Sequence, residues 1–256
     1  MRDTDIGAPF ELGYTDCTPL LDASLCAAAI SKLPPWRAKK AEAVRQPRDR
    51  ALVTGAGLLF RHMLLQAGVP RQQLDTCISV AQGKPTLRPF HPSESSGTDT
   101  AKAFSVSENG SNAFPNQVPG FNLSHSGRYA ACIVGAGMCG IDIEQIKEKG
   151  NFSRIAERFF CENERIYLKS SEETSEAFYK IWTLKESYMK YTGMGFALAP
   201  GKIHSDIKQR RVWADELPEA QFSWFVRRDA VLCACIDTNA SMAEPCFYDI
   251  NRLLDT

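Results

Sequence analysis

The stretch CIVGAGMCGIDIE, residues 132–144, constrains the fold of this 256-residue chain more than any other. Gly135, Gly137 and Gly140 fit the G-x-G-x-x-G fingerprint of dinucleotide-binding folds, which requires a strand before the glycines and a helix that begins within them. The apolar run before Gly135 is typical of a strand, but the IDIE that follows Gly140 also alternates like a strand. We therefore interpret residues 135–140 as a connection between two strands.

Two carboxylates follow these glycines on one side of the second predicted strand. Because successive side chains of a strand point to opposite faces, Ile141 and Ile143 are expected in the core, while Asp142 and Glu144 emerge together about 7 Å apart. Like charges at that spacing repel unless a cation or a proton compensates them, and Mg²⁺ binds one or two carboxylates together with phosphate oxygens and water. The pair fits a metal site, although an amphipathic edge strand with its acids in water would show the same pattern.

The segment SEAFYKIWTLKESYMKYTGMG, residues 175–195, predicts an amphipathic helix that ends at Gly193. Trp182, Glu186 and Lys190 follow one another at positions i, i+4 and i+8 on one face of this helix. Glu186 could ligate a metal ion there while Lys190 reaches a phosphate one turn later. An ordinary Glu–Lys ion pair on a surface helix is the alternative.

The chain also contains a basic segment and a segment poor in large apolar residues. Residues 91–118 are rich in Ser, Asn, Pro and Gly, which predicts a flexible surface loop. The basic segment indicates either a solvated helix face or a clamp for phosphate. Its basic residues are Arg37, Lys39, Lys40, Arg45, Arg48 and Arg50.

Charge and cysteine content exclude several classes of function. Thirty basic and thirty acidic residues cancel, so bulk nucleic-acid binding is disfavoured. No stretch approaches about 18 uninterrupted apolar residues and no apolar signal region begins the chain, which predicts a cytoplasmic protein without a membrane segment. Nine cysteines without a C-x-x-C pair argue against a zinc site or a disulfide framework, so Cys132, Cys233 and Cys235 are expected as reduced core residues.

Four motifs, GKP, FNLSHS, GIDIE and WTLKESYMK, occur in the order and approximate spacing found in one enzyme family. In these motifs the chain resembles the 4′-phosphopantetheinyl transferases of the Sfp (surfactin-synthetase-activating) type, over roughly residues 30–240. The resemblance implies an α+β fold of two similar halves related by a pseudo-twofold axis, with the site in the cleft between them. We place the halves at residues 1–138 and 139–256, with RYAACIV and DAVLCACI as equivalent strands.

The activity implied by the resemblance is a Mg²⁺-dependent transfer, with Mn²⁺ as a possible substitute. The 4′-phosphopantetheine group of coenzyme A passes to a serine of an acyl or peptidyl carrier protein, which converts the apo carrier to the holo form and releases adenosine 3′,5′-bisphosphate. The partners would be carrier proteins or carrier domains of fatty acid, polyketide or nonribosomal peptide synthases. Because the serine comes from the partner, the enzyme needs no nucleophile of its own. A monomer is expected, because the internal twofold would supply both halves of the site in one chain.

The resemblance also implies roles for acidic and basic residues of the second half. Asp142, Glu144 and Glu186 would hold the metal on the pyrophosphate, whose charge the metal neutralises during transfer. Glu186 is the first choice as catalytic base, and Glu164 of RFFCENE is the second because it matches a recurring family glutamate. Metal ligation would lower the basicity of Glu186. Lys190 would contact the phosphates and assist the leaving group.

Residues of the first half would hold the nucleotide end of coenzyme A. His125 resembles the family histidine at the 3′-phosphate and is included among the expected catalytic residues. Ser124 lies beside it in the sequence. Lys84 of GKP, Lys40 and Arg37 match basic positions that would add charge-assisted bonds to phosphate.

In this family the region after residue 150 approaches the carrier protein, so Arg154, Arg158 and Arg165 could steer an acidic partner. Two rival functions remain open at the level of sequence. One is a Mg²⁺-dependent phosphodiester hydrolase that cleaves coenzyme A with water, and the other is a non-catalytic module that binds coenzyme A.

Overall fold

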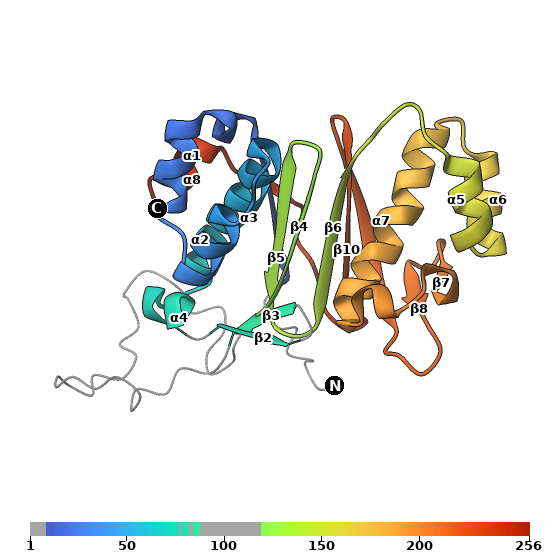
Figure 1. The fold of residues 1–256 in the computed structure, drawn as a ribbon. Helices are drawn as coiled ribbons and strands as arrows, with labels where there is room; N and C mark the ends of the chain where they lie inside the picture. Colours follow the sequence, from blue (N-terminus) through green and yellow to red (C-terminus); the bar gives the residue numbers. More distant parts are fainter. Residues whose placement is uncertain (1–8, 77, 82–83, 88–118) are drawn as a thin grey trace, which may run out of the picture.

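The computed structural model describes residues 9–76, 78–81, 84–87 and 119–256, so the predicted surface loop at 91–118 lies outside the described residues (Figure 1). Among the described residues, no helix is both long enough and apolar enough to cross a membrane. Helices and sheets are mixed along the chain, which confirms the predicted α+β fold class.

The first sheet has the strand order β11-β1-β5-β4 and the second has the order β6-β10-β9-β8-β7. The strands of the first sheet are β1 (Glu11–Asp16), β4 (Gly120–Ser126), β5 (Tyr129–Gly135) and β11 (Cys246–Phe247). The strands of the second are β6 (Cys139–Gln145), β7 (His204–Asp206), β8 (Arg211–Trp213), β9 (Ala220–Arg227) and β10 (Ala230–Asp237). A separate hairpin joins β2 (Ile78–Ala81) and β3 (Lys84–Leu87).

Two long helices cover the outer faces of the sheets: α3 (Pro47–Gln66) packs on β1, β4 and β5, and α7 (Thr174–Thr192) packs on β6 and β10 (Figure 1). The shorter helices are α1 (Ala23–Ile30), α2 (Pro35–Glu42), α4 (Arg71–Thr76), α5 (Phe152–Phe159), α6 (Glu162–Ser170) and α8 (Ile250–Leu254). The 3₁₀ turns are η1 (Thr18–Leu21), η3 (Gly195–Ala197) and η4 (Pro200–Lys202).

The two halves share one topology. In the first half β1 leads through α3 to the hairpin β4–β5, and the strands lie in the order β1-β5-β4. In the second half β6 leads through α7 to the hairpin β9–β10, and the strands lie in the order β6-β10-β9. The strands predicted as equivalent from RYAACIV and DAVLCACI are therefore β5 and β10, which hold matching central positions.

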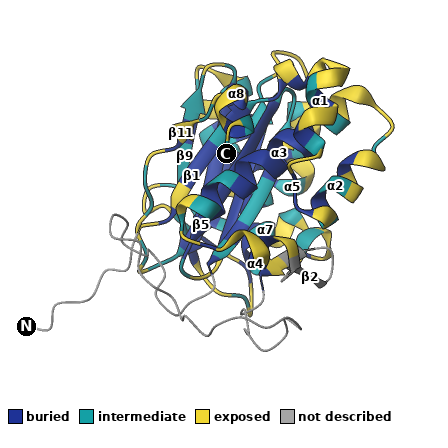
Figure 2. Ribbon diagram, turned by 90° about the vertical axis from the view of Figure 1, so that its left-hand side faces the viewer, coloured by how far each residue is buried: buried dark blue, intermediate teal, exposed yellow. Residues whose placement is uncertain are grey.

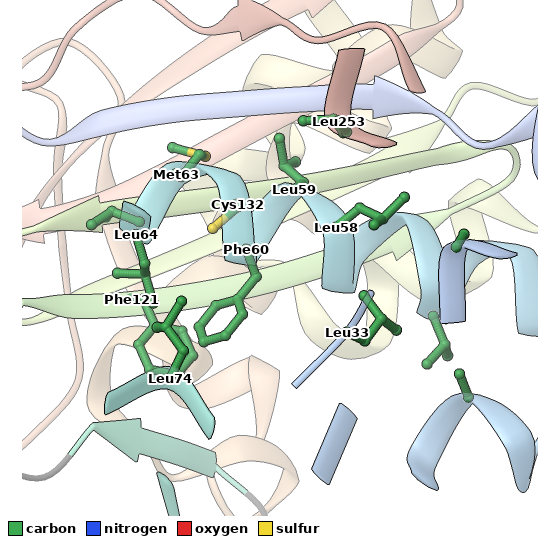
Figure 3. Packing of buried hydrophobic residues seen from close by; sticks show 14 of the residues in the cluster. Leu33, Leu58, Leu59, Phe60, Met63, Leu64, Leu74, Phe121, Cys132 and Leu253 are labelled. Atoms are coloured by element: carbon green, nitrogen blue, oxygen red, sulfur yellow. The ribbon is translucent and has the colours of Figure 1, made fainter. Parts of the chain in front are cut away.

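The two central strands, β5 and β10, have continuously apolar sequences because their alternate residues are buried on opposite faces. Ala131 and Ile133 of β5 face the second sheet, whereas Cys132 and Val134 pack toward α3. Residues buried on both faces leave no polar side to a strand. The side under α3 is filled by leucines and Phe60 from the helix (Figure 3), and buried residues dominate α3 and β5 while α1 is largely exposed (Figure 2). The predicted burial of Cys132, Cys233 and Cys235 as free thiols is confirmed.

The end of the chain crosses back to the first half. Strand β11 pairs in parallel with β1, and Ile250 and Leu253 of α8 are buried in the same cluster as α3. The assignment of all of residues 139–256 to the second half is thus too simple, because apolar side chains at the C-terminus find their burial beneath α3. Residue 138 lies in the link between β5 and β6.

Two glycines of the opening motif, Gly135 and Gly140, allow close packing, and the third, Gly137, allows a turn. A Cβ on Gly135 would lie 2.1 Å from the ring of Phe10, and one on Gly140 would lie 2.0 Å from Ser187 O of α7. Gly137 has a φ of 118°, in the left-handed region. Residues 135–140 connect two strands, as the alternation after Gly140 predicts, and no helix begins there.

Candidate active site

A pocket of about 960 Å³ opens between the two halves, with walls from α2, β4, β6, α7 and the segment after α7. It is lined by seven of the residues predicted to act at the phosphates and the metal, together with Ser124. The seven are Arg37, Lys40, His125, Asp142, Glu144, Glu186 and Lys190. The fold therefore brings together residues that are distant in the sequence.

The acids of β6 lie on the face predicted from the strand alternation. Ile141 and Ile143 are buried between the two sheets, while Asp142 and Glu144 line the pocket. The missing side chain of Gly140 lets α7 approach β6 closely, since Ser187 O and Tyr191 N occupy the space of a Cβ. This close approach puts Glu186 and Lys190 of α7 opposite the strand that carries the two acids.

Lys190 and Ser124 hold one oxygen of Asp142. The Lys190 ammonium donates to Asp142 Oδ1 at 2.6 Å, to Ser124 Oγ at 2.8 Å and to Ile141 O at 3.1 Å. Ser124 Oγ in turn donates to the same Oδ1 at 2.7 Å. The second oxygen, Oδ2, is buried and has no hydrogen-bond partner among the described residues. A buried carboxylate oxygen is rarely left unpaired, which indicates that a ligand completes the site.

A parallel contact orients the second acid, because Ser126 Oγ donates to Glu144 Oε2. Each acid of IDIE is thus paired with one serine of SHS across the two halves. Burial and then the neighbouring charge of Asp142 raise the pKa of Glu144 above its usual value, against the opposite effect of the Ser126 hydrogen bond. The serines fix the orientation of both carboxylates without neutralising them.

Glu186 is the most strongly perturbed carboxyl of the pocket. Burial, followed by the charges of Asp142 and Glu144, raises the pKa of Glu186 to about 7, although Lys190 acts in the opposite direction. Mutual repulsion of this kind is relieved by a proton or by a cation. Glu186 can therefore exchange a proton near neutral pH in the absence of a ligand.

The donor set fits a hard cation such as Mg²⁺. Carboxylate oxygens from β6 and α7 face one pocket, and Asp142 Oδ2 lacks a partner among the described residues. In the described part of the chain, no group of three or more His, Cys, Asp or Glu side chains is placed so that it could hold a metal ion. An ion held here would need further ligands from a substrate, as is usual for Mg²⁺ on phosphates.

Basic residues form the opposite wall. Arg37 is only 4% exposed, its Nη2 donates to Val53 O at 3.2 Å, and its buried Nε has no partner among the described residues. Burial lowers the pKa of Arg37 to about 10, so the side chain stays charged at neutral pH. Desolvation, followed by the positive charges of Arg37, Lys190 and Lys40, lowers the pKa of His125, although the residue as a whole is exposed. This concentration of positive charge fits an anionic ligand.

The structure does not bring Glu164, the second choice as base, into the pocket. Glu164 is fully buried in the first turn of α6, where Oε2 accepts from Cys161 N at 2.9 Å and Oε1 accepts from Ser205 Oγ at 2.8 Å. Its Oε2 also lies 2.8 Å from the buried Lys185 ammonium. These contacts use both oxygens of Glu164 within the protein. The Glu164 carboxylate also balances the charge of Lys185, a buried lysine that the sequence pattern did not single out.

The remaining predicted residues are Lys84 and three arginines, and none of the three arginines lines the described pocket. Lys84 begins β3, but its side chain is outside the described part of the structure. Arg154 and Arg158 lie on α5 and Arg165 on α6, with the Arg158 guanidinium 5.0 Å from the centre of the Phe159 ring. Apolar residues at the rim of the pocket, above all Phe196, were missed because their sequence context resembles an ordinary helix end.

Comparisons with known proteins agree with these observations. Residues 138–235 match the model of the 4′-phosphopantetheinyl transferase superfamily. The chain is 33% identical over 127 residues to the 4′-phosphopantetheinyl transferase Sfp of Bacillus subtilis (strain 168), covering 48% of this chain and 56% of that protein. It is 46% identical over 91 residues to the 4′-phosphopantetheinyl transferase gsp of Aneurinibacillus migulanus, covering 35% of this chain and 38% of that protein.

The chain thus spans about half or less of the length of these two relatives. Among solved structures, the holo-[acyl-carrier-protein] synthase (AcpS) of Thermotoga maritima is 18% identical with a TM-score of 0.30, covering 39% of this chain and 62% of that one.

Proposed function

We propose that this chain, whose resemblance to the Sfp-type 4′-phosphopantetheinyl transferases the comparisons confirm, transfers 4′-phosphopantetheine from coenzyme A to a serine of a carrier protein. The observation that carries the proposal is the composition of one pocket. Three carboxyls and Lys190 lie on one side of it, and the basic wall of Arg37, Lys40 and His125 lies on the other. A ligand with several phosphates next to a metal-dependent reacting centre fits this arrangement.

Each group of the pocket has a role in that reaction. Arg37, Lys40 and His125 bind the phosphates of the nucleotide end, with Ser124 beside them. Asp142, Glu144 and Glu186 would hold Mg²⁺, and when bound this ion neutralises the charge that develops on the pyrophosphate oxygens. Lys190 holds Asp142 Oδ1 in place and offers positive charge to the departing phosphate.

The transfer exchanges one P–O bond for another. The serine hydroxyl of the carrier attacks the phosphorus that bears the pantetheine, the bond from this phosphorus to the second phosphate breaks, and adenosine 3′,5′-bisphosphate leaves. The hydroxyl proton goes to Glu186, directly or through a water. Burial raises the pKa of Glu186 to about 7 in the pocket without a metal, and a Mg²⁺ ion bound to Glu186 would lower it, so the route through a water applies when Glu186 ligates the metal.

The partners that fit this reaction are apo acyl or peptidyl carrier proteins, or carrier domains of fatty acid, polyketide or nonribosomal peptide synthases. Because both halves of the pocket come from one chain, a monomer suffices for the reaction, and the cytoplasm is where coenzyme A and such carriers would meet it. The arginines Arg154, Arg158 and Arg165 would steer an acidic carrier toward α5 and α6.

Intact-mass spectrometry of apo carrier proteins incubated with coenzyme A and Mg²⁺ tests the proposal. The wild type is expected to add a group of about 340 Da, the mass of phosphopantetheine transferred by the metal-assisted mechanism. Asp142→Ala and Glu186→Ala should abolish the addition while circular dichroism shows a folded chain. Arg228→Ala, on the exposed β9–β10 turn, is the matched control and should act like the wild type.

Two results would contradict the proposal. Release of bisphosphate without modification of any carrier would identify a hydrolase. Binding of coenzyme A with neither cleavage nor transfer across a broad carrier panel would identify a non-catalytic module.

A further inference from the structure

Lys190 lies in the last turn of α7, which ends at Thr192 and is followed by Gly193. The last turn of a helix has carbonyl groups without partners inside the helix, and helix ends fray easily. The Lys190 ammonium nevertheless meets two strands, since it donates to Ser124 Oγ of β4 and to Asp142 Oδ1 of β6. These contacts require that the last turn is held in register with both strands by groups outside the helix.

Tyr191, the residue after Lys190, provides such an anchor. It is only 2% exposed and does not line the described pocket. Its ring stacks on Tyr188 with the ring centres 5.9 Å apart, and its Oη donates to Asp237 Oδ1 at 2.8 Å. Burial, followed by this hydrogen bond, raises the pKa of Tyr191 above its ordinary value, so the hydroxyl keeps its proton at neutral pH. Because Asp237 is the last residue of β10, the end of α7 is tied to that strand.

The second oxygen of Asp237 holds the link between the two halves. Met138 N donates to Asp237 Oδ2 at 3.0 Å, and a Cβ on Gly137 would lie 2.4 Å from the same oxygen. Strand β4 packs on this link as well, because a Cβ on its first residue, Gly120, would lie 2.1 Å from Gly137 O. One carboxylate therefore joins the end of α7 to the short segment that leads into β6 and contacts β4.

Asp237 is itself held in place through its backbone. Its carbonyl oxygen accepts from Gln221 Nε2 at 2.9 Å and from Ala240 N at 3.0 Å. The carboxylate is thus a fixed point for α7, β4 and β6, the three elements whose side chains meet at the Lys190 ammonium.

We propose that Asp237 and Tyr191 form a clamp that positions Lys190 from outside the pocket. This inference rests on the proposed function, in which Lys190 offers positive charge to the departing phosphate. Neither residue of the clamp lines the described pocket, so both act through the backbone of α7. A shift of the last turn carries the Lys190 ammonium with it, and a small displacement of a group that acts on the transition state lowers the rate.

Steady-state kinetics of carrier modification separates positioning from stability. Tyr191→Phe removes only the hydroxyl, and kcat should fall about tenfold through the displaced lysine. The KM for coenzyme A should stay unchanged, because the phosphate-binding residues of the first half keep their places. Tyr188→Phe is the matched control, since the Tyr188 Oη donates to Pro218 O at 2.8 Å and accepts from Ala214 N at 3.1 Å, both within the second half. It should lower the melting temperature at least as much as Tyr191→Phe and keep the kcat of the wild type.

Variants of Asp237 test the other side of the clamp. Asp237→Ala removes both side-chain contacts and should lower kcat further than Asp237→Asn, which keeps an acceptor oxygen for Tyr191. Hydrogen exchange followed by mass spectrometry reports on the clamp without any reaction. In Asp237→Ala the peptides that contain Met138 and the last turn of α7 should exchange faster than in the wild type, while those of α3 should not change.

The same measurements can overturn the inference. A Tyr191→Phe variant with the kcat of the wild type rejects the clamp. Equal losses of kcat in Tyr191→Phe and Tyr188→Phe reject it too, because they would show a general loss of stability. Unchanged exchange of both peptides in Asp237→Ala also contradicts it. A wild-type protein that modifies no carrier rejects the proposed function instead, and the exchange result then decides by itself whether Asp237 holds the last turn of α7.

Discussion

Lys185 and Glu164 form an ion pair of 2.8 Å in which both side chains are fully buried. Lys185 Nζ also donates to Pro200 O and Ile203 O, so the pair ties α6 and α7 to the chain that follows η4. At the scale of single residues, this pair assigns Glu164 a structural task although its motif suggested a catalytic one. Buried ions cost free energy to desolvate, and the loss of one partner leaves the other uncompensated.

Replacement of Lys185 by Met tests this assignment. The variant should lose about 3–5 kcal/mol of unfolding free energy, because Glu164 would remain buried without its cation. Urea denaturation followed by circular dichroism measures the loss. Lys180→Met is the control, since Lys180 pairs with Glu176 at 2.6 Å on a partly exposed face of the same helix. It should lose less than about 1 kcal/mol. Equal losses in the two variants would argue against a special role for the buried pair.

At the scale of elements, the site depends on the contact between α7 and β6. Helix α7 is positioned so that Ser187 O lies 2.0 Å and Tyr191 N 2.4 Å from where a Cβ of Gly140 would be. The apolar periodicity of the helix predicts which face is buried, but not the distance from the strand. That distance places Lys190 on Asp142, and it requires glycine at position 140.

Gly140→Ala is therefore expected to push α7 away from β6. Overpacking against backbone atoms should cost about 1–3 kcal/mol of unfolding free energy. Carrier modification should fall further than stability does, because Glu186 and Lys190 move with the helix. Thermal denaturation and the mass assay measure the two effects. In Gly201→Ala the new methyl carbon would lie 3.5 Å from its nearest neighbour, Arg158 O, so this variant should match the wild type. An active, fully stable Gly140→Ala would show that the helix position is not critical.

At the scale of the whole molecule, Asp229 in the β9–β10 turn joins the two halves next to Gln145, which follows Glu144 on β6. It accepts from Tyr129 Oη at 2.5 Å and from Arg128 Nη2 at 3.2 Å, both of the first half. Gln145 Nε2 donates to its other oxygen at 2.6 Å, and Arg128 also pairs with Asp16 at 3.3 Å. The hydrogen bond from Tyr129, against a smaller desolvation effect, lowers the pKa of Asp229.

Asp229→Asn should destabilise the fold by about 1 kcal/mol at neutral pH, through weaker hydrogen bonds at a partly exposed site. Because the folded pKa lies below the ordinary value of 3.8, the folded state binds fewer protons, and the extra stability is present above pH 3.8 and is lost below it. Urea titrations should therefore show the same difference between wild type and variant at pH 7 and pH 5, and a smaller one at pH 3. The exposed Asp215→Asn is the control. A difference that grew on acidification would refute the assignment.

Much of the fold and part of the site follow from local patterns. Alternation in IDIE predicts a strand with both acids on one face, and the helical repeat around WTLKES predicts α7 with Glu186 and Lys190 one turn apart. The four motifs carry the family resemblance. Such patterns reflect the geometry of a single helix or strand. This geometry depends on residues that are close in the sequence, so it can be predicted from the sequence.

Contacts between distant residues are not readable in this way. The pairing of Glu164 with Lys185, the return of β11 and α8 to the first half, and the position of Phe196 over the pocket all depend on how elements pack. By itself the sequence determined the element types, the face of each acid and the resemblance to a family. The tertiary structure alone decided which charged groups share the pocket and which are buried apart from it, because electrostatic and packing energies depend on distances in space and not on spacing along the chain.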